Sequence, residues 1–271
     1  MSEEMPEEIS EEKPPAAQRW GLPRLLWGMI VRPRVTLEYL RDREGRTWWI
    51  PVLLGVLLTA LPIVVAAPAT TRQAMLVAQE QWGERQVAEM PAEEQAQIES
   101  IAASPLLIVV FPAVGSVVGR VVGWLAWAGA LYLAGMALGG RSTFGQMFRT
   151  VVWTWLPYVL RGLLQTVYIL ASGQLIANPG LSGFIQGNHP AGEAVLVPPS
   201  LGQTVLQALL GQVDLFLFWN LILLVIGVMV VARLPRRKAA LVTLGVWLLL
   251  TALSLIPAIA GGLFAQQVGG F

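Results

Sequence analysis

Five long apolar stretches, with Arg and Lys sorted to alternate sides of them, constrain this 271-residue chain most strongly. A helix that crosses a bilayer needs about 20 mostly apolar residues in a row. Only 13% of the residues are charged, whereas soluble domains carry roughly 25%. The chain is therefore predicted to be an all-α integral membrane bundle with five transmembrane helices. The expected spans are residues 48–67, 116–138, 151–171, 213–232 and 239–264.

The distribution of basic residues predicts how the chain is threaded. Short loops on the cytoplasmic side of a membrane carry an excess of Arg and Lys. Eight basic residues precede the first span, two lie between spans two and three, and four lie between spans four and five, whereas the opposite side holds only Arg72 and Arg85. The three basic groups fall on the same side of the membrane only if the chain crosses it five times. The amino terminus is thus expected inside and the carboxyl terminus outside. The high Arg, Ala, Gly and Trp content favours a bacterial plasma membrane as the location.

Five segments outside the spans have distinct compositions. Residues 1–19 are rich in Glu and lack the basic start and apolar core of a secretory signal, which favours a disordered acidic tail. Residues 20–47 mix Trp and Leu with Arg, as expected for an amphipathic interfacial segment that Pro33 breaks. Residues 70–100 predict an outer polar helical arm, followed by an interfacial approach segment at 106–114. Residues 265–271 form a short tail.

Basic side chains at the inner side are candidates for contact with lipid phosphates. Clusters of Lys and Arg beside membrane helices are typical of anionic lipid binding. The alternative for residues 20–42 is a packed elbow without lipid specificity. The candidate lipid-facing residues are Arg24, Arg32, Arg34, Arg236, Arg237 and Lys238.

Three charged residues fall inside or at the ends of spans: Arg120, Arg161 and Asp214. Intramembrane charges are costly and often functional. Arg120 and Asp214 match in depth, so an ion pair between them is one expectation. Arg161 lies near the middle of its span and is expected to face the bundle interior, with carbonyls freed by Pro157 as partners. The alternative is a permease or transporter component that uses Arg161 with Asp214.

A row of small residues marks the second span. Gly115, Gly119 and Gly123 repeat at every fourth position, a spacing that lets helix backbones approach closely in lipid. The row predicts tight packing, either inside the bundle or in a homodimer.

Sequence signatures of catalysis are missing from the chain. It has no cysteine, and its one histidine, His189, lacks the neighbouring ligands of a metal site. No metalloprotease, nucleophile-elbow or P-loop pattern occurs. We therefore expect no enzyme activity, cofactor or metal. The net charge of +1 gives no reason to expect nucleic acid.

Short motifs resemble those of Yip domain proteins, the Ypt/Rab-interacting membrane proteins and their bacterial relatives. The matching stretches are Phe144-Gly145-Gln146-Met147-Phe148-Arg149, Val152-Trp153-Thr154-Trp155-Leu156-Pro157, Phe218-Trp219-Asn220-Leu221 with Gly227, and Arg236-Arg237-Lys238-Ala239. The basic Pro33-Arg34 elbow is similar to that of bacterial members.

The resemblance extends from about Leu25 to Phe264 and implies a five-span protein with a cytoplasmic amino terminus. Eukaryotic members act in vesicle traffic and contact small GTPases, but no Asp-Leu-Tyr-Gly-Pro segment precedes the first span here. Sequence and resemblance together predict a non-catalytic structural or membrane-organising protein. Its expected partners are the lipid bilayer, anionic lipid, and a protein partner or second copy.

Overall fold

The computed structural model describes residues 20–42, 46–82, 91, 93, 100, 104–176, 179–184 and 201–268. These residues form helices and connecting turns, without a strand among them, so the predicted all-α class is confirmed. The predicted acidic tail at 1–19 and most of the predicted arm beyond Trp82 lie outside the described residues.

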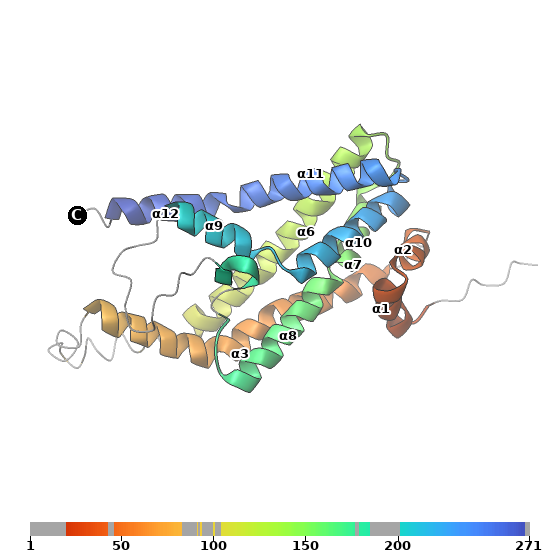
Figure 1. Cartoon of the computed structure of the whole chain (residues 1–271). Helices are drawn as coiled ribbons and strands as arrows, with labels where there is room; N and C mark the ends of the chain where they lie inside the picture. Colours follow the sequence, from red (N-terminus) through yellow and green to blue (C-terminus); the bar gives the residue numbers. More distant parts are fainter. Residues whose placement is uncertain are drawn as a thin grey trace, which may run out of the picture.

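Long helical rods lie side by side in alternating directions, and a pair of short helices covers one end (Figure 1). The short pair is α1 (Leu22–Val31) and α2 (Pro33–Arg41). The rods are α3 (Trp49–Trp82), the π-helical turn Leu106–Val110 with α6 (Phe111–Ala137), α7 (Phe144–Thr154) with α8 (Leu156–Ser172), α9 (Leu201–Gly211) with α10 (Leu215–Val231), and α11 (Arg236–Ser254) with α12 (Ile256–Val268). Single-turn 3-10 helices at Arg46–Trp48 and Gly180–Phe184 complete the elements.

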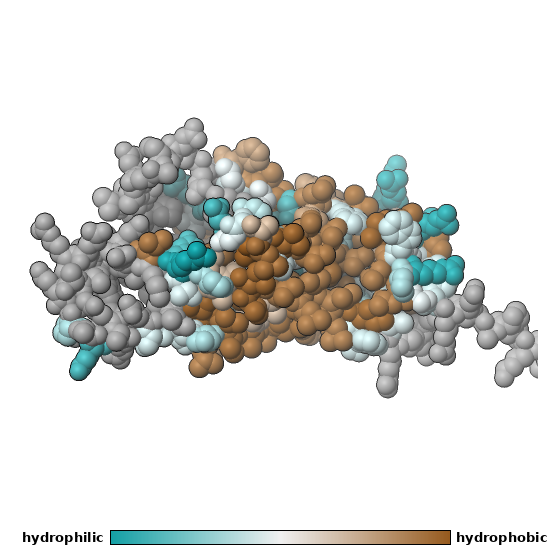
Figure 2. Space-filling model, turned by 90° about the horizontal axis from the view of Figure 1, so that it is seen from below, coloured by the Kyte–Doolittle hydropathy of each residue, from teal (hydrophilic) through white to brown (hydrophobic). Residues whose placement is uncertain are grey.

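Length and apolar composition allow three of these helices to cross a membrane: Trp49–Gln73, Leu106–Ala137 and Arg236–Gly261. The bent pair of α9 and α10 makes a fourth if it is counted as one span. The molecule is thus a helical membrane bundle. A hydrophobic band covers the middle of one face, and hydrophilic residues gather at its ends (Figure 2).

The helix bounds differ from the predicted spans in three places. The second rod begins at Leu106, because a π-helical turn leads into α6 without interruption. The sequence predicted only an interfacial approach segment at 106–114, before a span that begins at residue 116. The third rod breaks at Trp155, two residues before Pro157. Residues 201–211, which precede the predicted fourth span, form α9.

The break at Trp155 leaves a backbone carbonyl that another helix satisfies. Tyr158 N donates to Trp155 O at 3.0 Å instead of to the carbonyl four residues back. The Thr154 carbonyl accepts a hydrogen bond from Asn220 Nδ2 of α10 at 2.7 Å. Asn220 is only 1% exposed, so this bond satisfies two polar groups in the interior.

The break between α9 and α10 bends the rod by 60°. The turn at Gly180–Phe184 packs against this break, with Leu181 N donating to Val213 O at 3.1 Å. Gly180 has φ +63°, and a Cβ there would meet three carbonyl oxygens, of Leu210, Gly211 and Val213, at 2.7–2.9 Å. Only glycine fits this position without strain.

The core lies mainly at the end of the bundle that carries α1 and α2. One cluster joins Trp124, Leu131 and Met147 to Leu224 and Val228. A second cluster packs Leu25, Met29 and Leu37 of the two short helices against Trp153 and Leu223. The short helices turn at Pro33, as predicted, and their apolar faces are buried on α7 and α10. This elbow is therefore part of the bundle core.

Candidate functional site

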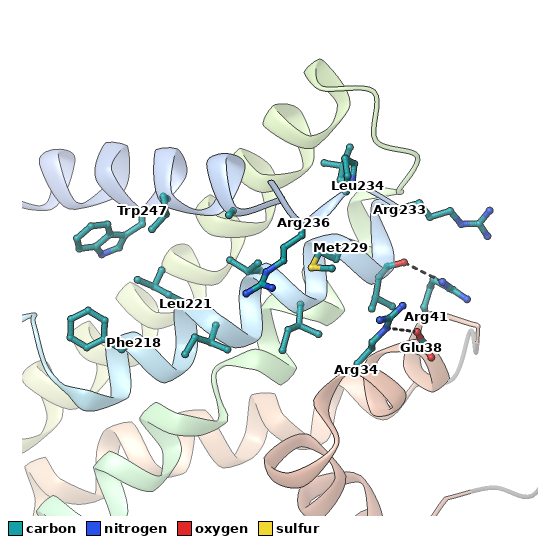
Figure 3. A pocket seen from close by; sticks show the side chains of 17 residues that line it. Arg34, Glu38, Arg41, Phe218, Leu221, Met229, Arg233, Leu234, Arg236 and Trp247 are labelled. Atoms are coloured by element: carbon teal, nitrogen blue, oxygen red, sulfur yellow. Dashed lines mark hydrogen bonds and ion pairs between the residues drawn. The ribbon is translucent and has the colours of Figure 1, made fainter. Parts of the chain in front are cut away.

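Arginines gather at the bundle end formed by α2 and the α10–α11 turn (Figure 3). Arg41 Nη1 donates to the Val230 carbonyl of α10 at 3.1 Å, and its Nε approaches Asp42 Oδ1 at 2.6 Å. The hydrogen bond from Arg41 holds the pKa of the Asp42 carboxyl below its usual range. Arg41 thus links α2 to the last turn of α10, where free carbonyls favour a cation.

A second set of bonds holds the turn between α10 and α11 against the loop that follows α6. Lys238 Nζ donates to the Leu138 carbonyl at 3.0 Å, and Arg141 N donates to the Ala232 carbonyl at 3.0 Å. Three segments far apart in the chain, around residues 41, 138–141 and 230–238, therefore meet at one end of the bundle. Their basic residues share that end.

A groove of about 1090 Å³ lies between α2, α10 and α11. Its walls are apolar and include Phe218, Leu221, Ile222, Met229, Leu244 and Trp247. Its mouth holds four arginines and a glutamate: Arg34, Glu38, Arg41, Arg233 and Arg236. We call this feature the α10–α11 groove. It combines an apolar trough with a basic opening.

The predicted lipid-facing residues do not all lie on this groove. Arg34 and Arg236 line its mouth, and Arg34 pairs with Glu38 at 3.1 Å. Arg24 and Arg32 line a smaller hollow on the elbow, where Arg24 stacks 4.3 Å from the ring centroid of Trp20. Arg237 and Lys238 lie beside the groove without lining it.

The intramembrane charges pair differently from the expectation based on depth. Arg161 Nη1 lies 2.9 Å from Asp214 Oδ2, and their side chains are 23% and 14% exposed. Asp214 also caps α10, accepting from Leu217 N at 2.8 Å. Arg120 instead donates from Nε to Thr59 Oγ1 at 3.3 Å. Asp214 therefore serves Arg161 and not Arg120, and the carbonyl freed near Pro157 is taken by Asn220.

A smaller cavity of about 360 Å³ lies beside Arg120 and Arg161, between α3, α6 and α8. Thr59, Ser116 and Gln165 add polar groups to its lining. Arg120 also lies 6.0 Å from the ring centroid of Trp155. The described residues include no group of three or more His, Cys, Asp or Glu side chains that could hold a metal ion. His189 lies outside the described residues.

Comparison with known protein families shows the family to which this chain is similar. Residues 27–261 match the model of the Yip1 domain, which covers most of the chain. The chain belongs to the Yip1 domain family. The resemblance seen in the sequence is thereby confirmed. No curated protein and no solved structure matches the chain significantly.

The Yip1 domain match includes all residues of the α10–α11 groove and all three intramembrane charges. The family is a family of membrane proteins, in agreement with the apolar helices. The groove itself was not predicted from the sequence. The basic turn at 236–238 indicated one side of its mouth, but the position of α2 opposite that turn depends on long-range packing.

The glycines that make close contacts in this Yip1 domain are not the predicted ones. A Cβ added at Gly115, Gly119 or Gly123 would meet no described atom within 4 Å. A Cβ at Gly162 would lie 2.5 Å from the Leu58 carbonyl oxygen of α3, and one at Gly227 would overlap Thr150 of α7. The sequence indicated Gly227 only as part of the motif shared with Yip domain proteins, and not as a packing residue.

Proposed function

We propose that this Yip1 domain protein is a non-catalytic, five-span protein of the cell membrane that organises the surrounding bilayer or holds a partner protein. Its basic end would face the cytoplasm, with the amino terminus inside and the carboxyl terminus outside. In this role the protein acts through helix packing and through the basic surface that it presents to anionic lipid headgroups.

The meeting of three basic segments at one bundle end carries this proposal. The hydrogen bonds from Arg41 to Val230, from Arg141 to Ala232 and from Lys238 to Leu138 hold these segments together. The helical rods alternate in direction (Figure 1), so successive connections fall at opposite ends. A cationic end is favoured at the cytoplasmic face of a membrane.

The alternative, a permease or transporter component based on Arg161 and Asp214, has less support. These two side chains neutralise each other at 2.9 Å, and Asp214 additionally caps α10. Both groups therefore have structural uses that account for their presence in the bundle. A paired charge at a helix break lowers the cost of burial for both partners.

Topology can be tested cleanly because the chain contains no cysteine. Arg237→Cys would place one thiol on the basic turn, and Gln174→Cys would place one after the end of α8. Intact cells are treated with a membrane-impermeant maleimide, and a second sample is treated after permeabilisation. We expect Gln174→Cys to react in intact cells and Arg237→Cys to react only after permeabilisation.

The matched controls are the cysteine-free parent and both variants labelled in detergent, where each single thiol should react. Labelling of both positions from the same side would contradict the proposed threading. Labelling of Arg237→Cys from outside would reverse it.

A further inference from the structure

We propose that the α10–α11 groove binds one anionic phospholipid, with an acyl chain between α10 and α11 and the phosphate at Arg236 and Arg233. This inference deepens the proposed membrane-organising function and rests on it for the choice of the inner leaflet. It assigns to one site the lipid contact that the sequence spreads over six basic residues.

The shape of the groove suits an acyl chain. Its volume of about 1090 Å³ lies just above the usual range for ligand pockets, roughly 300–1,000 Å³. Phe218, Ile222 and Leu244 on its walls are exposed in the protein alone. Exposed apolar residues at membrane depth face lipid, so a chain can enter sideways from the bilayer.

The charge of the mouth suits a phosphate. Arg34 is paired with Glu38, and Arg41 is held by Asp42 and the Val230 carbonyl. The side chains of Arg233 and Arg236 make no hydrogen bond or ion pair with the residues that the structure describes, although the charge of Arg233 helps to lower the pKa of Asp42. Figure 3 shows Arg236 extending from the start of α11 toward α10, while Arg233 points outward from the rim of the groove. Guanidinium groups bind phosphate oxygens through paired, charge-assisted hydrogen bonds.

The backbone at Arg233 provides an independent observation. Its φ of 55° lies in the left-handed region, where Arg233 is the only non-glycine residue among those described. Glycine usually occupies this position after a helix end, because a Cβ is disfavoured there. An arginine at this position places a cation at the groove mouth in spite of the backbone strain. A ligand with negative charge accounts for that arrangement.

Native mass spectrometry of the detergent-purified full chain tests the proposal. Phosphatidylglycerol and phosphatidylcholine with identical acyl chains are titrated separately, and adducts are counted. We expect one phosphatidylglycerol adduct that forms at least tenfold more tightly than the phosphatidylcholine adduct. Arg236→Gln should weaken it roughly tenfold, the factor that one charge-assisted hydrogen bond supports.

Two further variants separate lipid binding from folding. Arg233→Gly removes the cation and relieves the backbone, so it should weaken the adduct while the thermal unfolding midpoint stays equal or rises. Ala240→Trp fills the groove without a change of charge and should prevent the adduct. Arg237→Gln is the matched control, because Arg237 is adjacent to Arg236 but does not line the groove. It should leave the affinity within about twofold, well under the tenfold step.

Several results would overturn the inference. Equal binding of the two lipids would leave only unselective contact with bilayer lipid. Full binding by Arg236→Gln or Ala240→Trp would place the lipid elsewhere, and displacement by millimolar inorganic phosphate would indicate an anion site without a chain. A selective adduct together with reversed cysteine labelling would keep the site and discard the proposed orientation. Cysteine labelling as expected, without a lipid adduct, would keep the proposed orientation and discard the lipid site.

Discussion

α10 and α6 are both long apolar helices with glycines, yet the bundle uses them in different ways. Nine of the 17 residues of α10 are buried, and it contacts α2, α7, α8 and α11. In α6 the buried residues are Trp124, Ala128, Leu131 and Gly135, all in its second half. The glycine row lies in the first half of α6, and a Cβ added at any of its glycines would meet no described atom within 4 Å.

The difference teaches that a glycine promotes helix packing only when an atom lies opposite it. Gly227 of α10 is covered by Thr150, with Leu37 and Thr154 within 4 Å. Gly119 of α6 has the more recognisable spacing but meets open space among the described residues. The spacing of small residues therefore identifies a helix face that can pack, without identifying the partner.

Gly227→Leu should give the largest effect. The Cβ alone would overlap Thr150, which is 4% exposed and bonded through Oγ1 to the Gln146 carbonyl at 2.9 Å. Overpacking of this kind costs about 1–3 kcal/mol and sometimes more, and three further carbon atoms must displace α7 or α2. We expect a loss of about 3 kcal/mol or more, measured by unfolding in detergent with Trp fluorescence. A midpoint within error of the parent would contradict the packing of α7 on α10.

Asn220→Leu should give an intermediate effect on the same interface. The substitution removes the donor at 2.7 Å from the Thr154 carbonyl and leaves that carbonyl unsatisfied beside the break at Trp155. A buried group without its partner costs about 1–3 kcal/mol. The unfolding free energy should therefore fall by about 2 kcal/mol.

Phe218→Leu provides the control for the Asn220 change, because Phe218 lies two positions earlier in α10 and is exposed. It should leave the unfolding midpoint nearly unchanged. An equal loss in both variants would mean that leucine at either position disturbs α10 for reasons unrelated to the hydrogen bond.

The sequence predicted those features that depend on local composition. Proline and alternating basic and apolar residues defined the elbow at Pro33, and apolar length identified the membrane helices. The sequence named Arg161 with Asp214 only as an alternative and could not choose this pair over Arg120 with Asp214, because sequence gives approximate depth but not the direction in which a side chain points around its helix. Arg120 and Asp214 matched in depth and still belong to different contacts.

The α10–α11 groove also escaped prediction, since its mouth joins residues 34–41 with residues 233–236. These segments are distant in sequence, and the burial of Leu37 against α10 together with the hydrogen bond from Arg41 to Val230 brings them together. The break at Trp155 was signalled by Pro157, but the asparagine that satisfies the freed carbonyl lies 66 residues away. Contacts of this range require the folded chain.

Gly119→Leu should give the smallest effect and completes the comparison of α6 with α10. Since no described atom lies within 4 Å of the added Cβ, the side chain has room, and leucine favours a helix over glycine by up to about 1 kcal/mol. We expect an unfolding midpoint equal to that of the parent or slightly higher, and an unchanged mass by light scattering in detergent. A lower midpoint together with a lower mass would show that the face of α6 packs against a second copy. The row Gly115, Gly119 and Gly123 would then act between chains, and α6 and α10 would differ only in which molecule supplies the opposing surface.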